Sequence, residues 1–166
     1  MSKMNTTHRR VANMGNVFRA LKDSTTLNNI HLSYAIAKNI RLIEQHFATF
    51  KDIAKPTDDY MEFENARVKL NVEYAQKDGR KQPRIIDNKY IIDPEKQEQF
   101  DVAVNTLREE FKNVIATYEQ KQRDIEKMLD DECEVDLYPI KLSWISADFK
   151  PGDLEILMDL IEDDLN

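Results

Sequence analysis

The chain holds few side chains of the kinds that bind metals or attack substrates, namely three histidines and one cysteine among 166 residues. His8, His31 and His46 show no i, i+4 pairing, the spacing that sets two imidazoles on one face of a helix. We therefore interpret His31 and His46 as partly exposed helix histidines rather than metal ligands. Cys133 lies between two glutamates, and neighbouring negative charge raises the pKa of a thiol and lowers its reactivity. We expect no catalytic role for Cys133.

The acidic run around the cysteine, DDECEVD at 130–136, invites comparison with a calcium-binding loop. It lacks the glycine and the final glutamate that an EF-hand requires, so we interpret it as a helix end that continues into an acidic strand. Motifs of nucleotide-binding proteins, zinc proteases and serine hydrolases are absent from the sequence. The chain has only three glycines, whereas ligand-binding loops use glycine to bring backbone close to a ligand. The sequence therefore predicts a protein that is not an enzyme, with no catalytic, cofactor-binding or metal-binding residue.

Charge is distributed unevenly along the chain, although the net charge is only −7. Residues 1–55 hold nine Lys/Arg against three Asp/Glu, a net charge of +6, and residues 129–166 hold two against twelve, a net charge of −10. Either the two ends attract each other within the fold, or they form two separate binding surfaces. The single cysteine excludes an internal disulfide and fits a reducing cytoplasm. No apolar run approaches the ~18–20 residues that a membrane span needs.

Apolar residues at helical spacing mark the elements that carry these side chains. A short row predicts a helix over Val11–Lys22. A longer row ends before Pro56 and consists of Leu32, Ile36, Ile40, Ile43, Phe47, Phe50 and Ala54. The next helix presents Phe63, Ala66, Leu70 and Tyr74. The longest row follows a heptad pattern with one polar member and consists of Phe100, Val104, Leu107, Phe111, Val114, Tyr118, Lys121, Ile125 and Met128. We expect the 32–54 and 100–128 rows to bury against one another, with a homodimer seam as the alternative.

Two segments have strand character. The segment 83–93 contains two apolar pieces around Asp87-Asn88-Lys89, which predicts a tight β-hairpin. The segment 134–145 partly alternates, and Pro139 places it at a sheet edge, where the hairpin is a possible neighbour. A closing helix begins at Pro151, and its expected buried residues are Leu154, Leu157, Met158 and Ile161. Trp144 either packs this closing segment onto the long helices or anchors an interface.

These elements predict a helix-dominated α+β fold. It consists of an antiparallel, coiled-coil-like bundle of long helices, a small β element and a short C-terminal helix. Residues 1–10 are expected to form a flexible basic arm. Residues 11–166 are expected to form a single helical domain with the β element at 83–93 and 134–145.

Five landmarks occur in one order: LSYAIAKNI, EFENARVKLNVEYAQKDG, NKYIID, EVDLYPIKLSWI and KPGDLEILMDLIED. Together they resemble a family of small, acidic, uncharacterised proteins of tailed bacteriophages and prophages, over roughly residues 16–163. The chain departs from that family at the closing helix, where Lys150-Pro151 replaces a Thr-Pro start, and in a shorter stretch before the YIID-like strand. The resemblance implies a phage-encoded protein that acts in the cytoplasm of an infected bacterium or in the virion. It carries no catalytic residue to this chain.

Three functional hypotheses follow. The first is a phage accessory protein that binds a host or phage protein, for example one that inhibits a host defence system. The second is a tail or head-completion component of the virion, and the third is an acidic DNA mimic. The short basic arm lacks interleaved aromatic residues, so nucleic acid is not favoured as a partner. The candidate protein-interaction surface comprises Glu134, Asp136, Trp144, Asp159, Glu162 and Asp163.

Overall fold

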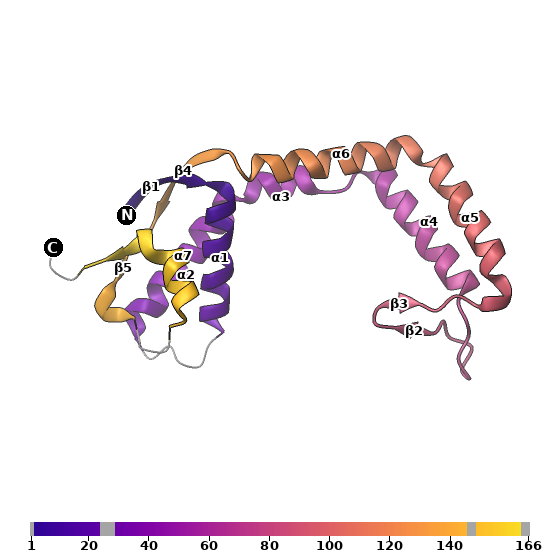
Figure 1. Ribbon diagram of the computed structural model, residues 1–166, viewed down its shortest axis with the longest axis horizontal. Coiled ribbons are helices and arrows are strands. Elements are labelled where there is room, and N and C mark those ends of the chain that lie inside the picture. Colours follow the sequence, from indigo (N-terminus) through magenta and orange to yellow (C-terminus); the bar gives the residue numbers. More distant parts are fainter. Residues whose placement is uncertain (1, 24–28, 146–148, 164–166) are drawn as a thin grey trace. The chain divides into compact units, whose positions relative to one another are not determined.

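The computed structural model describes residues 2–23, 29–145 and 149–163 (Figure 1). The chain divides into two compact units, whereas the sequence was expected to form a single domain. We call residues 1–54 with 124–166 the terminal unit, because it contains both ends of the chain, and residues 55–123 the hairpin unit. The hairpin unit is thus an insertion in the sequence of the terminal unit.

The fold is dominated by helices with small β elements, which confirms the predicted α+β class. The α-helices are α1 (His8–Lys22), α2 (Ile30–His46), α3 (Ala48–Ala54), α4 (Asp58–Tyr74), α5 (Gln97–Glu110), α6 (Lys112–Met128) and α7 (Pro151–Leu157). The strands are β1 (Ser2–Thr7), β2 (Ile85–Ile86), β3 (Lys89–Tyr90), β4 (Glu132–Leu137), β5 (Ile140–Lys141) and β6 (Ile161–Glu162). One-turn 3₁₀ helices are η1 (Pro94–Lys96), η2 (Leu142–Trp144) and η3 (Met158–Leu160).

The N-terminal segment is a strand and not the flexible arm expected over residues 1–10. β1 pairs antiparallel with β4, from Ser2 opposite Leu137 to Thr7 opposite Glu132 (Figure 1). Met4 turns inward and is buried, while its neighbours are polar. The sequence concealed this strand because one buried residue makes no alternating pattern and because the hydrogen-bonding partner lies far along the chain. β1 is also the neighbour of β4, a place that the sequence analysis considered for the 83–93 hairpin.

The core of the terminal unit lies among α1, α2, β4 and the closing segment. Its buried apolar residues are Met4, Val11, Met14, Val17, Phe18, Leu21, Leu32, Ala35, Ile36, Ile43, Val135, Leu137, Ile140, Leu157 and Leu160. The inner face of α1 thus has the predicted helical spacing. α2 packs on α1 and β4. The expected contact of the 32–54 row with the 100–128 row occurs at its end, where Phe50 and Ala54 line the same hollow as Ile125. A Cβ at Gly15 would lie 3.1 Å from Ile43 Cγ2, so glycine permits this close approach of α1 and α2.

The hairpin unit is built on α4, which runs antiparallel to α5 and the adjoining part of α6. Ring contacts join Tyr60 to Tyr118 at 3.7 Å between centroids, Phe63 to Phe111 at 5.7 Å, and Tyr74 to Phe100 at 5.7 Å. The heptad row over 100–118 therefore packs on α4. The heptad helix is also interrupted at Phe111, which separates α5 from α6.

The predicted tight hairpin at 83–93 is confirmed. Ile85 pairs with Tyr90 and Ile86 with Lys89, so the turn consists of Asp87 and Asn88. Both turn residues have positive φ, 49° and 60°, as a two-residue turn of the primed type requires. Asp and Asn adopt this left-handed conformation at lower cost than most residues, so the local sequence selects the turn.

The closing segment is shorter than predicted. α7 begins at Pro151, as expected, but ends at Leu157 and continues as the 3₁₀ turn η3. This change of pitch turns Met158 outward, with 62% of its surface exposed, and Leu160 takes the buried place. β6 then runs parallel to β5, with Ile140 opposite Ile161.

Among the described residues, Asn39 is the one buried polar residue, and its side chain binds the backbone of Tyr138. Its Oδ1 accepts a hydrogen bond from the backbone N–H of Tyr138 at 2.6 Å, and its Nδ2 donates to the carbonyl oxygen of Tyr138 at 2.8 Å. These two bonds satisfy the backbone between β4 and β5, where Pro139 interrupts the strand.

We expect Asn39→Ala to lower the free energy of unfolding by roughly 2–3 kcal/mol, because two backbone groups lose their partner in a poorly hydrated place. Asn13→Ala, at an exposed position of α1, is the matched control and should change stability little. Denaturant unfolding followed by fluorescence of Trp144, the single tryptophan, reports on the terminal unit. Equal stability of the two variants would contradict the role of Asn39.

Candidate functional site

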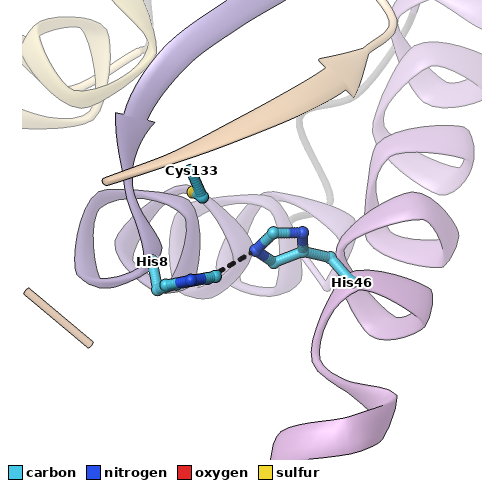
Figure 2. Close-up of side chains that lie close together, drawn as sticks. All are labelled: His8, His46 and Cys133. Atoms are coloured by element: carbon cyan, nitrogen blue, oxygen red, sulfur yellow. Dashed lines mark hydrogen bonds between the residues drawn. The ribbon is translucent and has the colours of Figure 1, made fainter. Parts of the chain in front are cut away.

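Three side chains that can bind a metal converge in the terminal unit: His8, His46 and Cys133 (Figure 2). His8 Nδ1 and His46 Nε2 are 2.8 Å apart and form a hydrogen bond. One nitrogen of each imidazole and the sulfur of Cys133 all lie within 4.8 Å of one another. All three residues are half-buried. Among the described residues, no other group of three histidine, cysteine or acidic side chains has its ligand atoms close enough to bind one metal ion.

The pairing of β1 with β4 places two members of the cluster. His8 is the first residue of α1 and directly follows β1, and the Thr7 hydroxyl caps the helix by accepting a hydrogen bond from Arg10 N–H. Cys133 lies opposite Thr6 in β4. Since side chains alternate along a strand, Cys133 shares its face with the buried Val135. The His8 backbone is held further by donating its N–H to the carbonyl oxygen of Asp131, at 3.3 Å.

The third member, His46, is the last residue of α2 and lies among aromatic rings. Its ring is 5.0 Å from that of Phe47, and the ring of His8 is 4.8 Å from that of Phe50, measured between centroids. Phe47 and Phe50 also contact each other edge to face. These rings cover one side of the imidazole pair with apolar surface.

Burial shifts the pKa of His46 and of Cys133 in opposite directions. It lowers the pKa of His46, and the neighbouring His8 lowers it further. Burial also raises the pKa of the Cys133 thiol. A protonated thiol is a poor nucleophile, so the arrangement does not suit covalent catalysis. Two imidazoles and one sulfur instead form the donor set that soft or borderline divalent metals prefer.

Sequence reasoning did not find this cluster. His8 and His46 are separated by 38 positions, and Cys133 joins from the other segment of the terminal unit. Local spacing rules detect ligands on one helix or one loop, so they are insensitive to ligands brought together by long-range packing. The signal that the sequence does offer is the presence of histidine and cysteine, because both are common metal ligands.

The candidate interaction surface predicted from sequence is divided by the fold. Glu134 forms an ion pair with Lys3 at 3.0 Å, and Asp159 forms one with Arg10 at 2.6 Å. The remaining members are placed as follows: Asp136 opposite Lys3 in the β1–β4 register, Trp144 stacked on His31 at 5.5 Å, Glu162 opposite Lys141, and Asp163 exposed. Two of the six residues are thus engaged by the N-terminal segment.

Ion pairs between the ends confirm the first interpretation of the charge asymmetry, in which the two ends attract. Arg9 contacts Asp130 at 2.6 Å and Glu126 at 2.8 Å, and it also donates to the carbonyl oxygen of Glu126. The guanidinium of Arg9 lowers the pKa of Asp130 through its hydrogen bond. The basic N-terminal segment therefore partly neutralises the acidic segment within one unit.

A groove in the hairpin unit is a second candidate site. Its apolar lining consists of Met61, Ala66, Leu107 and Phe111. Its polar lining consists of Asp58, Glu62, Asn65, Lys69 and Glu110. Three acids against one lysine make its polar lining negative. The sequence pattern gives no sign of this surface, because a heptad row predicts a stripe that is buried against a partner.

We expect Arg9→Gln to lower the melting temperature of the terminal unit at low ionic strength, because two carboxylates lose their cation. The difference from wild type should shrink at 1 M NaCl, where the screening length falls from about 10 Å at 0.1 M to about 3 Å. Arg123→Gln, which removes an exposed cation beside Glu119 within one helix, is the control and should have little effect. Thermal unfolding monitored by Trp144 fluorescence measures both. A salt-independent loss in Arg9→Gln would contradict an electrostatic role.

Comparison with known proteins does not extend this description. No family model matches the chain, and neither curated proteins nor solved structures match it. Among the described residues, no helix is long and apolar enough to cross a membrane. The function must therefore be argued from the His8–His46–Cys133 cluster, the charge pairing and the surface of the hairpin unit.

Proposed function

We propose that the chain acts by binding another protein, without enzymatic activity, and that the hairpin unit supplies the binding surface. The observation that carries this proposal is the poor burial of apolar side chains in that unit. Of the hydrophobic residues in the hairpin unit, all of which the structure describes, only Phe63 and Ala75 are buried. Its large exposed hydrophobic residues are Met61, Val68, Ile85, Ile86 and Val102.

The heptad row of α5 and α6 supports the same proposal. Its members in the hairpin unit are half-buried: Phe100, Val104, Leu107, Phe111, Val114 and Tyr118. A pair of helices covers each row on one side only, whereas bundles bury such rows between several helices. A further helix laid along α4 and α5 would complete a coiled-coil-like bundle and bury apolar surface at about 25 cal/mol per Å².

The groove between α4 and α5 indicates the chemistry of the partner. Its lining combines the apolar side chains of Met61 and Phe111 with the carboxylates of Asp58, Glu62 and Glu110. An amphipathic helix binds such a groove through its apolar face. Lysine or arginine beside that face would complement these carboxylates and favour encounter. The proposed partner therefore presents an amphipathic helix with basic flanks.

The resemblance to phage proteins supplies the proposed setting, the cytoplasm of an infected bacterium. The partner is then a host or phage protein, and a component of a host defence system is one class that an accessory factor would inhibit. A virion component is the alternative, and detection of the chain in purified particles by mass spectrometry would favour it. The intramolecular ion pairs of Glu134 and Asp159 reduce the acidic surface that a DNA mimic needs, so we do not favour that hypothesis.

Two exposed apolar positions on α4 allow a matched test of the groove. Met61 lines the groove and is 44% exposed, whereas Val68 lies outside its lining and is 41% exposed. A photo-crosslinking amino acid at position 61, in the full chain expressed during infection, should form a discrete product with a second protein. The same group at position 68 should form much less. A product of two copies of this chain would instead identify a homodimer.

Substitution at the same positions measures the energy of the contact. With the crosslinked partner in hand, Met61→Glu should weaken binding by at least about tenfold, about 1.4 kcal/mol, because a carboxylate would be buried against the apolar face of the partner helix. Val68→Glu should leave the affinity nearly unchanged. Equal crosslinking from both positions, or equal affinity of both variants, would contradict the groove as the binding surface.

A further inference from the structure

We propose that His8, His46 and Cys133 form a zinc-binding site that joins the start of α1, the end of α2 and β4. This site is independent of the groove in the hairpin unit. The proposal rests on the convergence of three ligand atoms from three elements (Figure 2). Nothing in it depends on an enzymatic activity.

The distances suit one tetrahedral ion. Zinc binds histidine nitrogen at about 2.0–2.1 Å and cysteine sulfur at about 2.3 Å, so two nitrogens on one ion lie about 3.3 Å apart. His8 Nδ1 and His46 Nε2 are 2.8 Å apart, and all three ligand atoms lie within 4.8 Å. Zinc binding therefore needs the imidazoles to separate by about half an ångström and the sulfur to approach by about one, shifts within side-chain rotation.

The donor set selects the class of metal. Imidazole and thiolate favour Zn²⁺, whereas Mg²⁺ and Ca²⁺ require oxygen ligands. No carboxylate belongs to the cluster among the described residues. Glu132 and Glu134 flank Cys133 on the strand and therefore point to the opposite face. A water molecule would complete four ligands.

The binding step balances with a single released proton. In the complex each neutral imidazole carries its N–H on His8 Nε2 or His46 Nδ1 and presents its other nitrogen to the ion. The imidazole that donates the hydrogen bond between the two rings therefore moves its proton to its other nitrogen, through solvent, as zinc binds. The Cys133 thiol loses its proton to solvent as sulfur bonds to zinc. Zinc, one thiolate, two neutral imidazoles and one water form a complex with a charge of +1. No oxidant or reductant is required.

The backbone around the ligands is already held in place. His8 donates its N–H to Asp131, and Arg9 donates its N–H to the carbonyl oxygen of Leu129 at 2.6 Å. Cys133 is paired with Thr6 in the β1–β4 ladder, one residue from its end. The phenylalanine rings against the two imidazoles restrict their orientation. A site whose ligands are positioned in this way loses little entropy when the ion binds.

The single thiol allows a test without any substitution. With the full chain reduced and free of metal, ZnCl₂ in slight excess should slow reaction of Cys133 with a thiol reagent by more than about tenfold, because the bound thiolate is no longer free. A chelator should restore the rate. Co²⁺ as a probe should give a thiolate-to-metal charge-transfer band at one ion per chain, together with the strong visible absorption of a four-coordinate site.

Matched variants assign the ligands. His8→Asn and His46→Asn should abolish the protection of Cys133 and the charge-transfer band. His31→Asn, which changes the third histidine at the opposite end of α2, should retain both. Unprotected Cys133 in the wild-type chain, or protection that survives both His8→Asn and His46→Asn, would overturn the proposal. The wild-type measurement remains decisive if a variant fails to fold.

Discussion

The pairing of β1 with β4 is the constraint on which the terminal unit depends. It joins residues 2–7 to residues 132–137, the two segments that the hairpin unit separates in the sequence. The ladder aligns the basic N-terminal segment with the acidic one, so the ion pairs of Lys3 and Arg9 follow from it. It also places His8 beside the strand that carries Cys133. These ion pairs and the approach of His8 to Cys133 are therefore consequences of one long-range pairing, whereas α2 supplies His46.

The hairpin unit obeys a different constraint. Two helices in contact bury one narrow stripe each, and aromatic stacking along that stripe, such as Tyr60 on Tyr118, holds α4 against α5 and α6. Lys121, the polar member of the heptad row, donates to the carbonyl oxygen of Lys55 at 2.8 Å. The polar residue thus holds the chain just before α4 instead of joining an apolar seam. A unit of this kind keeps apolar surface in contact with solvent, which is the physical basis of its proposed role in binding.

Elements with local determinants could be predicted from the sequence. The Asp87-Asn88 turn, the inner face of α1 and the start of α7 at Pro151 depend on nearby residues, and all three were recovered. Elements with distant determinants were not. β1 forms because β4 offers its edge, and the 32–54 row is divided at Phe47 between α2, which packs on α1 and β4, and α3. The same reason hid the cluster, whose three members share no local pattern.

The three residues of the cluster come from both segments of the terminal unit. Both histidines belong to the first segment of the terminal unit and Cys133 to the second, and the hairpin unit of residues 55–123 lies between these segments in the sequence. Joining two segments across such a long insertion costs chain entropy that grows slowly with its length. A metal held by His8, His46 and Cys133 would offset that cost in the folded state, as cross-links across long loops do. Zinc binding and β1–β4 pairing would then stabilise the same closure, so each should strengthen the other.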